Sequence, residues 1–367
     1  MRIEKIHLSN FKNYPEADLD VSAKINVLVG RNGSGKTNLL DAIHYLSFTR
    51  SAFQSSDFQN IRHGENYFFI KGQISLDARL HEITCGVQQG LKKNFRNENA
   101  EYQKISDHIG KYPIVLMAPD DVDLVKEGSE SRRKFFDSMI SQIDKVYLEN
   151  LIQYNYALKQ RNSLLKMFQE TGKTDWLALE MYDNTLIPLG EAIHARRKEF
   201  VTEFIPTFRR FYNFLVDECE ITNLNYLSGL TETRFADGLL KSRNKDIALL
   251  RTSFGIHRDD FEFTLGNGDL KRLGSQGQQK SFVIALKMAQ AEVIRNHKGF
   301  NPVLLLDDIF DKLDDHRITK LLELIKNDAS QLFISDARPD RTQGLLKQIK
   351  VEASVFVVEN GNITRHV

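Results

Sequence analysis

The sequence predicts an α/β fold with a helical segment inserted between its two halves. Near the amino terminus, the apolar run 25–29 leads through a glycine-rich loop into a helical pattern. Near the carboxyl terminus, the apolar run 302–306 ends in Asp307 and Asp308, and a helical pattern follows. Between about residues 129 and 250, apolar residues instead follow the spacing of long helices. Strands that alternate with helices at both ends of the chain predict a parallel sheet.

The glycine-rich loop reads Gly30-Arg31-Asn32-Gly33-Ser34-Gly35-Lys36-Thr37, which is the GxxxxGK[ST] pattern of a phosphate-binding P-loop. Its glycines let backbone N–H groups turn toward phosphate oxygens, and the next helix presents its positive end. We expect Lys36 to reach the β- and γ-phosphates of ATP and the Thr37 hydroxyl to hold Mg²⁺. An ordinary turn is the alternative, and the flanking strand and helix argue against it.

The strand that ends in Asp307 supplies the second half of such a site. A carboxylate at the carboxyl end of a buried parallel strand can hold Mg²⁺ opposite the Thr37 hydroxyl. Asp308, one residue on, is placed to orient or deprotonate the attacking water. The alternative is an Asp pair that caps the next helix.

A third segment, Ser275-Gln276-Gly277-Gln278-Gln279-Lys280, opens a helix with small and polar residues that could grip a γ-phosphate. Alone it is a weak signal. Together with the P-loop and Asp307 it resembles the signature motif of ABC-type ATPases, in which one subunit's segment closes over the nucleotide on the other's P-loop. The predicted fold is therefore an ABC-type P-loop ATPase head with an inserted helical arm.

Several stretches make the resemblance closer. The sequence resembles the RecF family, which is related to SMC heads. The matching stretches follow the order of the chain and include the P-loop and residues 275–280. The others are Asn10–Tyr14, Gly128, Arg132–Asp137, Leu158–Asn162, Gly255–Asp260 and Leu304–Asp314. The resemblance implies a weak ATPase that forms a homodimer on ATP and binds DNA at gaps and junctions. It also implies RecO and RecR as partners in recombination, replication restart and the SOS response to DNA damage.

The resemblance also assigns residues. It places Asn10, Phe11 and Lys12 near the adenine and phosphates of ATP. It places Ser275, Gly277 and Gln278 against the ATP of the partner subunit.

Three departures from the ABC pattern favour a slow switch over a fast motor. Asp308 stands where a glutamate is usual, Phe333–Asp336 has no switch histidine, and Pro119–Asp121 offers acids in place of the Q-loop glutamine.

We predict three segments. Residues 1–125 form the first part of the head, 126–250 the helical arm, and 251–367 the rest of the head. In the arm, Arg161 and Arg196 occupy positions where the helical seams call for apolar residues. We expect both arginines to reach solvent or to pair with acids as the helices pack together.

The overall composition leaves the DNA-contacting surface open. The formal net charge is only +1, so DNA binding needs a local basic patch. The candidate clusters, each of which could equally be a solvated helix face, are Arg132–Lys134, Arg196–Lys198, Arg209–Arg210, and Lys92, Lys93 and Arg96. His257–Asp260 lies on one strand or turn, so we interpret it as a structural or interface network and not as a metal cluster.

The two cysteines, Cys85 and Cys219, lack metal-type spacing and are expected to be reduced thiols. No run approaches eighteen apolar residues and no signal peptide is apparent, so we expect a cytoplasmic protein without a membrane span.

Three other functions share parts of this pattern: a transport ATPase subunit, a P-loop small-molecule kinase and a non-catalytic scaffold. The helical insert of roughly 120 residues and the missing switch histidine argue against the transporter subunit. A kinase would have no need of Ser275. An ATPase assay on a Lys36 variant would distinguish a non-catalytic scaffold from an ATPase.

Overall fold

The computed structural model describes residues 1–21, 23–216, 220–309, 315–328, 331–338, 344 and 352–366. It divides into two compact units. Unit 1 comprises Met1–Asp121, Phe214–Asp217 and Lys280–Val367, and unit 2 comprises Val122–Asn213 and Glu218–Gln279. Cys219 and residues 310–314 of the RecF-like stretch lie outside the described residues.

Unit 1 contains the parallel sheet that the alternating pattern predicted. Its strand order is β15-β14-β3-β13-β12-β8, with bounds β3 Ile25–Val29, β8 Ile114–Met117, β12 Val303–Asp307, β13 Leu332–Asp336, β14 Ser354–Glu359 and β15 Asn362–His366. All neighbours pair in parallel except β14 and β15, which form a hairpin. The strands β3, β12 and β13 are buried along their whole length, as expected for a sheet covered on both faces.

Parallel order brings the carboxyl ends of these strands to one edge of the sheet. The P-loop follows β3, and Asp307 ends β12. Because β13 lies between β3 and β12, Ser335 near its end completes this group.

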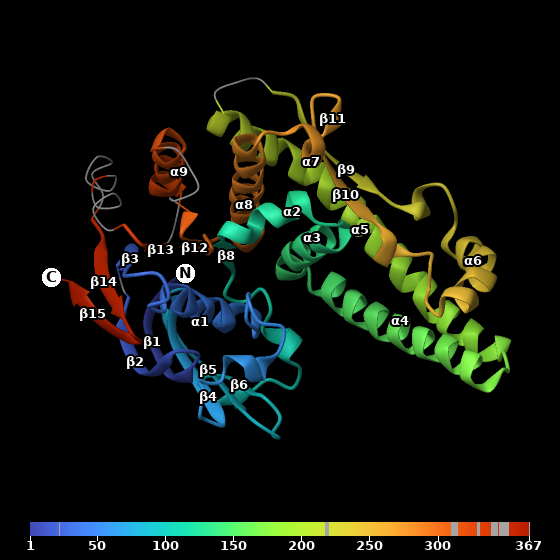
Figure 1. Ribbon diagram of the computed structural model, residues 1–367, viewed down its shortest axis with the longest axis horizontal. Coiled ribbons are helices and arrows are strands. Elements are labelled where there is room, and N and C mark those ends of the chain that lie inside the picture. Colours follow the sequence, from blue (N-terminus) through green and yellow to red (C-terminus); the bar gives the residue numbers. More distant parts are fainter. Residues whose placement is uncertain are drawn as a thin grey trace. The chain divides into compact units, whose positions relative to one another are not determined.

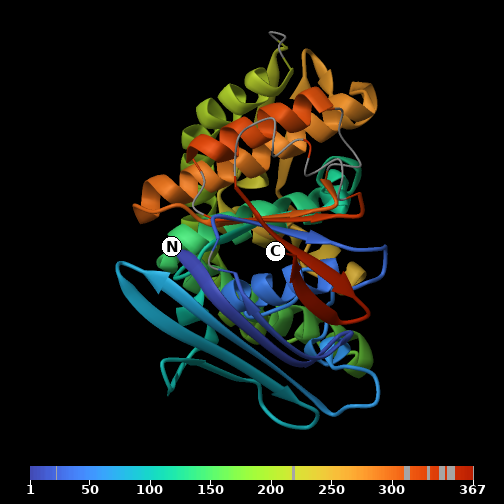
Figure 2. The same ribbon diagram turned by 90° about the vertical axis from the view of Figure 1, so that its left-hand side faces the viewer.

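A second, antiparallel sheet in unit 1 has the order β2-β1-β4-β5-β6-β7. Its strands are β1 Arg2–Phe11, β2 Tyr14–Asp20, β4 Tyr67–Leu76, β5 Arg79–Gln88, β6 Asn94–Asn97 and β7 Ala100–Glu101. Helix α1 (Lys36–Phe48) packs against strands of both sheets, and its Leu39, Ile43 and Leu46 join them in one core. Helix α9 (Asp315–Asp328) and the part of α8 (Gln276–Lys298) in unit 1 cover the other face of the parallel sheet (Figures 1 and 2).

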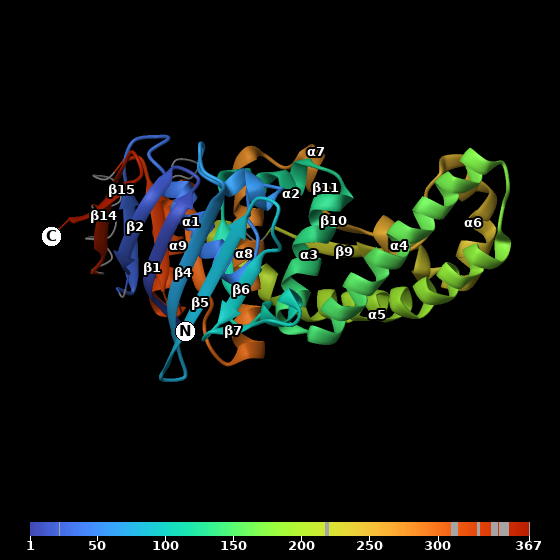
Figure 3. The same ribbon diagram turned by 90° about the horizontal axis from the view of Figure 1, so that it is seen from below.

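Unit 2 is mainly helical. Its helices are α2 Asp123–Lys126, α3 Ser129–Ile143, α4 Lys145–Thr171, most of α5 Trp176–Val216, α6 Phe235–Leu249 and α7 Leu270–Leu273. The two longest, α4 and α5, run side by side (Figure 3). A small antiparallel sheet has the order β11-β10-β9, with bounds β9 Thr222–Leu227, β10 Asp260–Leu265 and β11 Gly268–Asp269.

Short 3₁₀ turns occur in both units among the described residues. They are η1 Asp57–Asn60, η2 Ile105–His108, η3 Pro119–Val122, η4 Gly229–Thr231 and η5 Ile256–Arg258.

The small sheet moves one predicted boundary. We predicted that the helical segment ends at residue 250, but the second unit continues to Gln279. The reason is that β10 pairs with β9 over six residues, so the chain after 250 returns to the helical unit before it enters unit 1. The residue pattern within one strand does not reveal which distant strand it pairs with.

Two arginines lie inside the helical seams of unit 2. Arg161 is fully buried and pairs with Asp183 at 2.7 Å and Asp246 at 2.8 Å, so the predicted pairing with acids is confirmed. Arg196 also pairs with an acid, Asp144 at 3.1 Å, and is partly exposed, so the same expectation is confirmed for it. The buried arginine of this second seam is its neighbour, Arg197.

There is a physical reason why Arg197, and not Arg196, occupies the buried position of this helical seam. Buried positions of α5 follow Leu186, Ile193, Arg197 and Phe200, a spacing of seven, four and three residues. Arg197 keeps this spacing because acids neutralise it: its guanidinium contacts Asp137 at 2.9 Å and Asp259 at 3.0 Å. A buried arginine without such partners would be strongly destabilising.

Candidate nucleotide site and signature segment

The P-loop backbone requires glycine at two places. Gly35 has φ 121°, a conformation that L-residues with side chains rarely adopt. At Gly30, a Cβ atom would lie 2.3 Å from the Val358 carbonyl oxygen of β14. The loop therefore fits against the sheet edge only with these glycines, which supports the P-loop interpretation over an ordinary turn.

Two side chains, Asn13 in the turn after β1 and Tyr14 at the start of β2, hold the loop in place. The Tyr14 hydroxyl donates to the Gly35 carbonyl oxygen at 2.8 Å, and the Asn13 amide donates to the Ser34 carbonyl oxygen at 2.9 Å. Burial raises the pKa of Tyr14, so its hydroxyl stays protonated and remains a donor. Both residues lie within a motif of the sequence that gives no sign of this role.

The Lys36 ammonium lies at the mouth of the loop. Lys36 is buried, and its Nζ donates to the Gly30 carbonyl oxygen at 2.9 Å and to the Arg31 carbonyl oxygen at 3.2 Å. These are neutral acceptors, which an anion in the loop can replace with stronger, charge-assisted hydrogen bonds.

A pocket of about 380 Å³ opens beside Lys36. Ligand pockets commonly have volumes of ~300–1,000 Å³, so this one can hold a phosphorylated ligand. Its lining combines the loop and the start of α1 with one residue that follows β8 and one that follows β12, namely Asn32, Gly33, Gly35, Lys36, Thr37, Asn38, Pro119 and Asp308.

Thr37 and Asp307 meet at this pocket. The Thr37 hydroxyl lies 2.9 Å from Oδ1 and 3.0 Å from Oδ2 of Asp307. Asp307 is almost fully buried, and burial raises the pKa of its carboxyl. Mg²⁺ prefers hard oxygen ligands and commonly uses one or two protein groups beside phosphates and waters, so this hydroxyl–carboxylate pair fits it.

Asp308 lines the same pocket, and Ser335 connects it to Asp307. The Ser335 hydroxyl donates to Asp307 Oδ1 at 2.7 Å, and the Asp308 N–H donates to Ser335 Oγ at 2.9 Å. An Asp pair that merely caps the next helix would not need this arrangement. In the sequence, Ser335 is notable only as part of a segment that lacks the switch histidine.

Asn10, Phe11 and Lys12 are not among the residues that line this pocket. Phe11 is fully buried and packs against Tyr45 and Phe68 in the core, so no part of its ring is exposed to a base. The Lys12 ammonium forms a buried ion pair with Asp41 of α1 at 2.6 Å. Asn10 lies in the left-handed region at φ 51°, where its carbonyl oxygen accepts the Arg62 N–H.

The acids at the position of the Q-loop divide into two kinds. Asp121 accepts a hydrogen bond from the Ala118 N–H at 2.7 Å and pairs with Lys287 of α8 at 2.7 Å. Asp120 is exposed. Pro119 is the member of this segment that lines the pocket.

The segment from Ser275 to Lys280 begins α8 with a reciprocal cap. The Ser275 N–H donates to Gln278 Oε1 at 2.8 Å, and the Gln278 N–H donates to Ser275 Oγ at 3.2 Å. Ser275 is exposed, and Gly277 and Gln278 are half-buried. The cap presents the helix start on the surface of unit 2.

The cluster His257–Asp260 is part of a network in unit 2, which confirms our interpretation of it as structural. Asp259 accepts from Arg197, and Asp260 forms a two-point ion pair with Arg132 at 2.8 and 2.9 Å. Burial lowers the pKa of His257 to about 4, so the ring is neutral near pH 7 and bonds to the Tyr154 hydroxyl.

Some side chains of the candidate basic clusters already form ion pairs with acids. Lys134 pairs with Glu130, and Lys93 pairs with Asp57, each at 2.7 Å. By contrast, Lys92, Arg96 and Lys198 are exposed and make no ion pair with any residue that the structure describes. These three positions remain the better candidates for contact with a polyanion.

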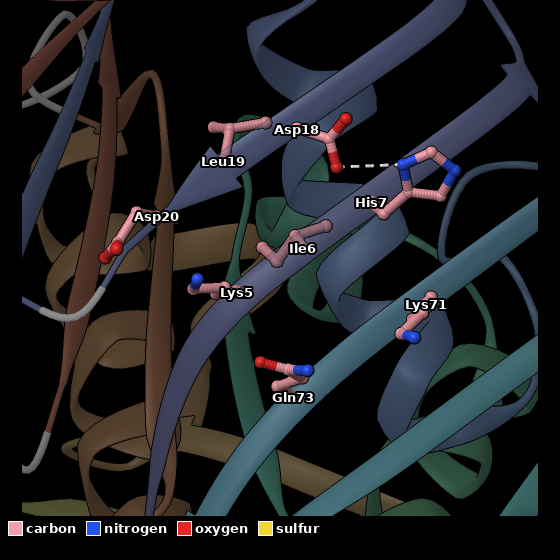
Figure 4. A pocket seen from close by; sticks show the side chains of 8 residues that line it. All are labelled: Lys5, Ile6, His7, Asp18, Leu19, Asp20, Lys71 and Gln73. Carbon is pink, nitrogen blue, oxygen red and sulfur yellow. Dashed lines mark hydrogen bonds and ion pairs between the residues drawn. The ribbon is translucent and has the colours of Figure 1, made fainter.

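Another pocket, of about 350 Å³, lies on the outer face of the antiparallel sheet in unit 1 (Figure 4). Its edge carries a hydrogen bond between His7 and Asp18 at 2.9 Å. With Glu16 these residues form the one group of three possible metal ligands among the described residues. The register sets His7 opposite Asp18 and Lys5 opposite Asp20, and cross-strand pairs of opposite charge stabilise antiparallel sheets without a ligand.

The α/β fold, the P-loop and the acid at the end of β12 define an ABC-type P-loop ATPase head with a helical insert, as we predicted. The family model described as "RecF/RecN/SMC N terminal domain" matches residues 2–364. The chain belongs to the RecF family, which confirms the resemblance found in the sequence. This membership leaves no support for the transport ATPase or small-molecule kinase interpretations.

Relatives match over nearly the whole chain. The DNA replication and repair protein RecF of Cytophaga hutchinsonii is 44% identical over 99% of this chain and 96% of its own length. The corresponding protein of Flavobacterium johnsoniae is 44% identical over 97% of this chain and 99% of its own length. A solved structure, "Structure of the recombination mediator protein RecF-ATP in RecFOR pathway", superposes with a TM-score of 0.90 at 30% identity, covering 100% of this chain and 98% of that one. None of the described helices is long and apolar enough to cross a membrane.

Proposed function

We propose that this protein is an ATP-dependent, DNA-binding recombination mediator in DNA replication and repair. The contact between Thr37 and Asp307 carries the proposal, because it completes a site for a nucleotide with its metal ion from two ends of the chain. The names of the RecF relatives and of the RecF-ATP structure support the same function.

In the proposed mechanism, the backbone of Gly30 to Thr37 surrounds the phosphates of ATP. The Lys36 ammonium leaves the Gly30 and Arg31 carbonyl oxygens for phosphate oxygens. Thr37 and Asp307 would hold Mg²⁺, which when bound would supply neutralising charge at the phosphates. Asp308, at the pocket wall, orients the attacking water and accepts its proton.

We further propose that ATP closes a homodimer. Ser275, Gly277 and Gln278 would contact the nucleotide on the partner's P-loop, for which the exposed start of α8 is suited. The closed dimer would hold DNA at gaps and junctions, and slow hydrolysis would release it. RecO and RecR would be its partners, in the cytoplasm and within the response to DNA damage.

DNA binding measured with and without nucleotide tests this function. Fluorescence anisotropy of a gapped duplex should show tighter binding with ATP and Mg²⁺ than with either omitted, and hydrolysis should rise when DNA is added. If affinity for DNA is the same with and without ATP, the proposed coupling is wrong. If ATP is bound but never hydrolysed, the protein is a non-catalytic scaffold.

A further inference from the structure

Ser335 lies on β13, between the strand that leads into the P-loop and the strand that ends in Asp307. It is fully buried, so water cannot substitute for its hydroxyl. The hydroxyl has one proton, which it donates to Asp307 Oδ1 at 2.7 Å. Its oxygen accepts the backbone N–H of Asp308 at 2.9 Å. One side chain thus contacts both acids of the site.

The contact to Asp308 restrains an unusual backbone. Asp308 has φ 43°, in the left-handed region that residues other than glycine seldom occupy. Such conformations persist where surrounding contacts hold them, and they cluster at functional sites. In this conformation Asp308 lines the nucleotide pocket. The hydrogen bond from its N–H to Ser335 therefore helps to fix the direction in which the carboxylate leaves the strand.

The contact to Asp307 acts on the other acid. A carboxylate that binds a metal ion is held in orientation by the hydrogen bonds it accepts, and loss of such a partner commonly lowers metal affinity or activity by ~10–100-fold. Here Ser335 and Thr37 both donate to Asp307. When Thr37 turns toward a metal ion, Ser335 remains to hold the carboxylate.

We propose that Ser335 is a positioning residue for ATP hydrolysis. It sets the Asp307 carboxylate for Mg²⁺ and the Asp308 carboxylate for the attacking water, through one hydroxyl. It does so in a strand-end segment that lacks the histidine expected of an ABC-type site. This inference rests on the proposed ATPase function and adds a residue to it.

The decisive variant is Ser335→Ala, which removes the hydroxyl and adds no bulk. Two quantities should change. Affinity for Mn²⁺, followed by electron paramagnetic resonance in the presence of a non-hydrolysable ATP analogue, should fall about 10- to 100-fold. The rate of hydrolysis at saturating ATP and Mg²⁺ should fall as well, because Asp308 loses its anchor. Affinity for the analogue without a metal ion should stay unchanged, since the P-loop is intact.

Two further variants separate positioning from general destabilisation. Ser335→Thr keeps a hydroxyl and should restore Mn²⁺ affinity at least in part. Ser47→Ala removes another buried serine hydroxyl of unit 1, at the far end of α1, and should leave both quantities unchanged. A purely structural role would change the unfolding midpoint of Ser335→Ala without a selective loss of Mn²⁺ affinity.

The outcomes distinguish this inference from the proposed function. If the wild-type protein hydrolyses ATP, and Ser335→Ala binds Mn²⁺ and hydrolyses ATP equally well, the role of Ser335 is wrong while the ATPase stands. If the wild-type protein neither binds the analogue nor hydrolyses ATP, the proposed function itself fails.

Discussion

The Thr37 hydroxyl donates to the carboxylate of Asp307, a residue 270 positions further along the chain, at 2.9 Å. The two residues meet because β13 lies between β3 and β12, and parallel order brings the ends of these strands to one edge of the sheet. Each residue alone is an ordinary polar side chain. Together they form the oxygen pair on which the proposed Mg²⁺ site depends.

Asp308 should affect hydrolysis but not binding. Asp308→Asn retains the shape of the side chain and leaves the backbone bond to Ser335 in place, but an amide cannot accept a proton from water. Hydrolysis should fall by ~10²–10⁴, while affinity for ATP stays near that of the wild type. Single-turnover assays with labelled ATP measure both quantities. Unchanged turnover would move the general base to another residue, and exposed Asp120 is the next candidate because Asp121 is paired with Lys287.

DNA affinity should depend on exposed, unpaired cations. The pair of substitutions Lys92→Glu and Arg96→Glu should weaken DNA binding for all sequences alike. It should also lower the slope of log affinity against log salt by up to about 2, because fewer counterions are displaced. Anisotropy titrations at several salt concentrations give this slope, with Lys134→Glu as a control at a lysine that is already paired. A wild-type affinity that does not change with salt would exclude electrostatic binding.

The cluster Arg196–Lys198 is unsuitable for that test as a whole. Arg197 is buried between Asp137 and Asp259, so reversal of its charge would leave three acids together in unit 2 and destabilise the fold. Only Lys198 of this cluster is exposed and can be reversed alone.

Stability should decrease below neutral pH through His108. This histidine is fully buried between the Leu46 carbonyl oxygen and the Tyr102 hydroxyl, and burial lowers its pKa to about 4. Between pH ~6.5 and 4, the unfolded histidine binds a proton that the folded one does not. The free energy of unfolding should therefore fall by about 3 kcal/mol over this range. Urea unfolding at pH 7 and pH 5 should show a smaller difference for His108→Gln, and an equal difference would contradict this account.

Ser275 should act on the partner's nucleotide. Ser275→Arg should leave ATP binding by the monomer nearly intact, because its own P-loop is unchanged. In the dimer the bulky cation would clash with the nucleotide, so dimer closure and hydrolysis should both fail. Ser275→Ala is the control for the lost helix cap, which costs ~1 kcal/mol by itself.

Mixing Ser275→Arg with Lys36→Met makes the test stricter. A mixed dimer has one composite site with both substitutions and one with neither, so partial ATPase activity should return. If mixed dimers form without activity, and the Ser275→Arg monomer has lost ATP binding, then Ser275 acts within its own subunit and our assignment is wrong.

The sequence predicted those parts of the site that depend on neighbours along the chain. The P-loop needs its glycines and Lys36 at fixed spacing, and Asp307 follows an apolar strand, so both are visible as patterns. Tyr14 and Ser335 are different. Their roles come from single hydrogen bonds across the fold, to Gly35 and to Asp307, and no local pattern marks such partners.

The same limit explains why the sequence did not single out Arg197. A heptad pattern with a charged residue leaves its phase open, so it marks Arg196, whose pairing with acids is confirmed, and not the buried neighbour. The acids that pair with the buried Arg197, Asp137 and Asp259, come from distant segments of the chain. The boundary at residue 250 failed for a related reason, since β10 finds its partner β9 in the preceding unit.

Sedimentation velocity with and without ATP and Mg²⁺ tests the central claim most directly, namely that ATP in this P-loop closes a homodimer. Asp308→Asn, which should bind ATP without hydrolysing it, is predicted to be monomeric alone and dimeric with ATP and Mg²⁺. Lys36→Met lacks the ammonium at the mouth of the loop and should stay monomeric under both conditions. Normal ATP-dependent dimers of Lys36→Met, or an Asp308→Asn protein that remains monomeric with ATP, would contradict the account.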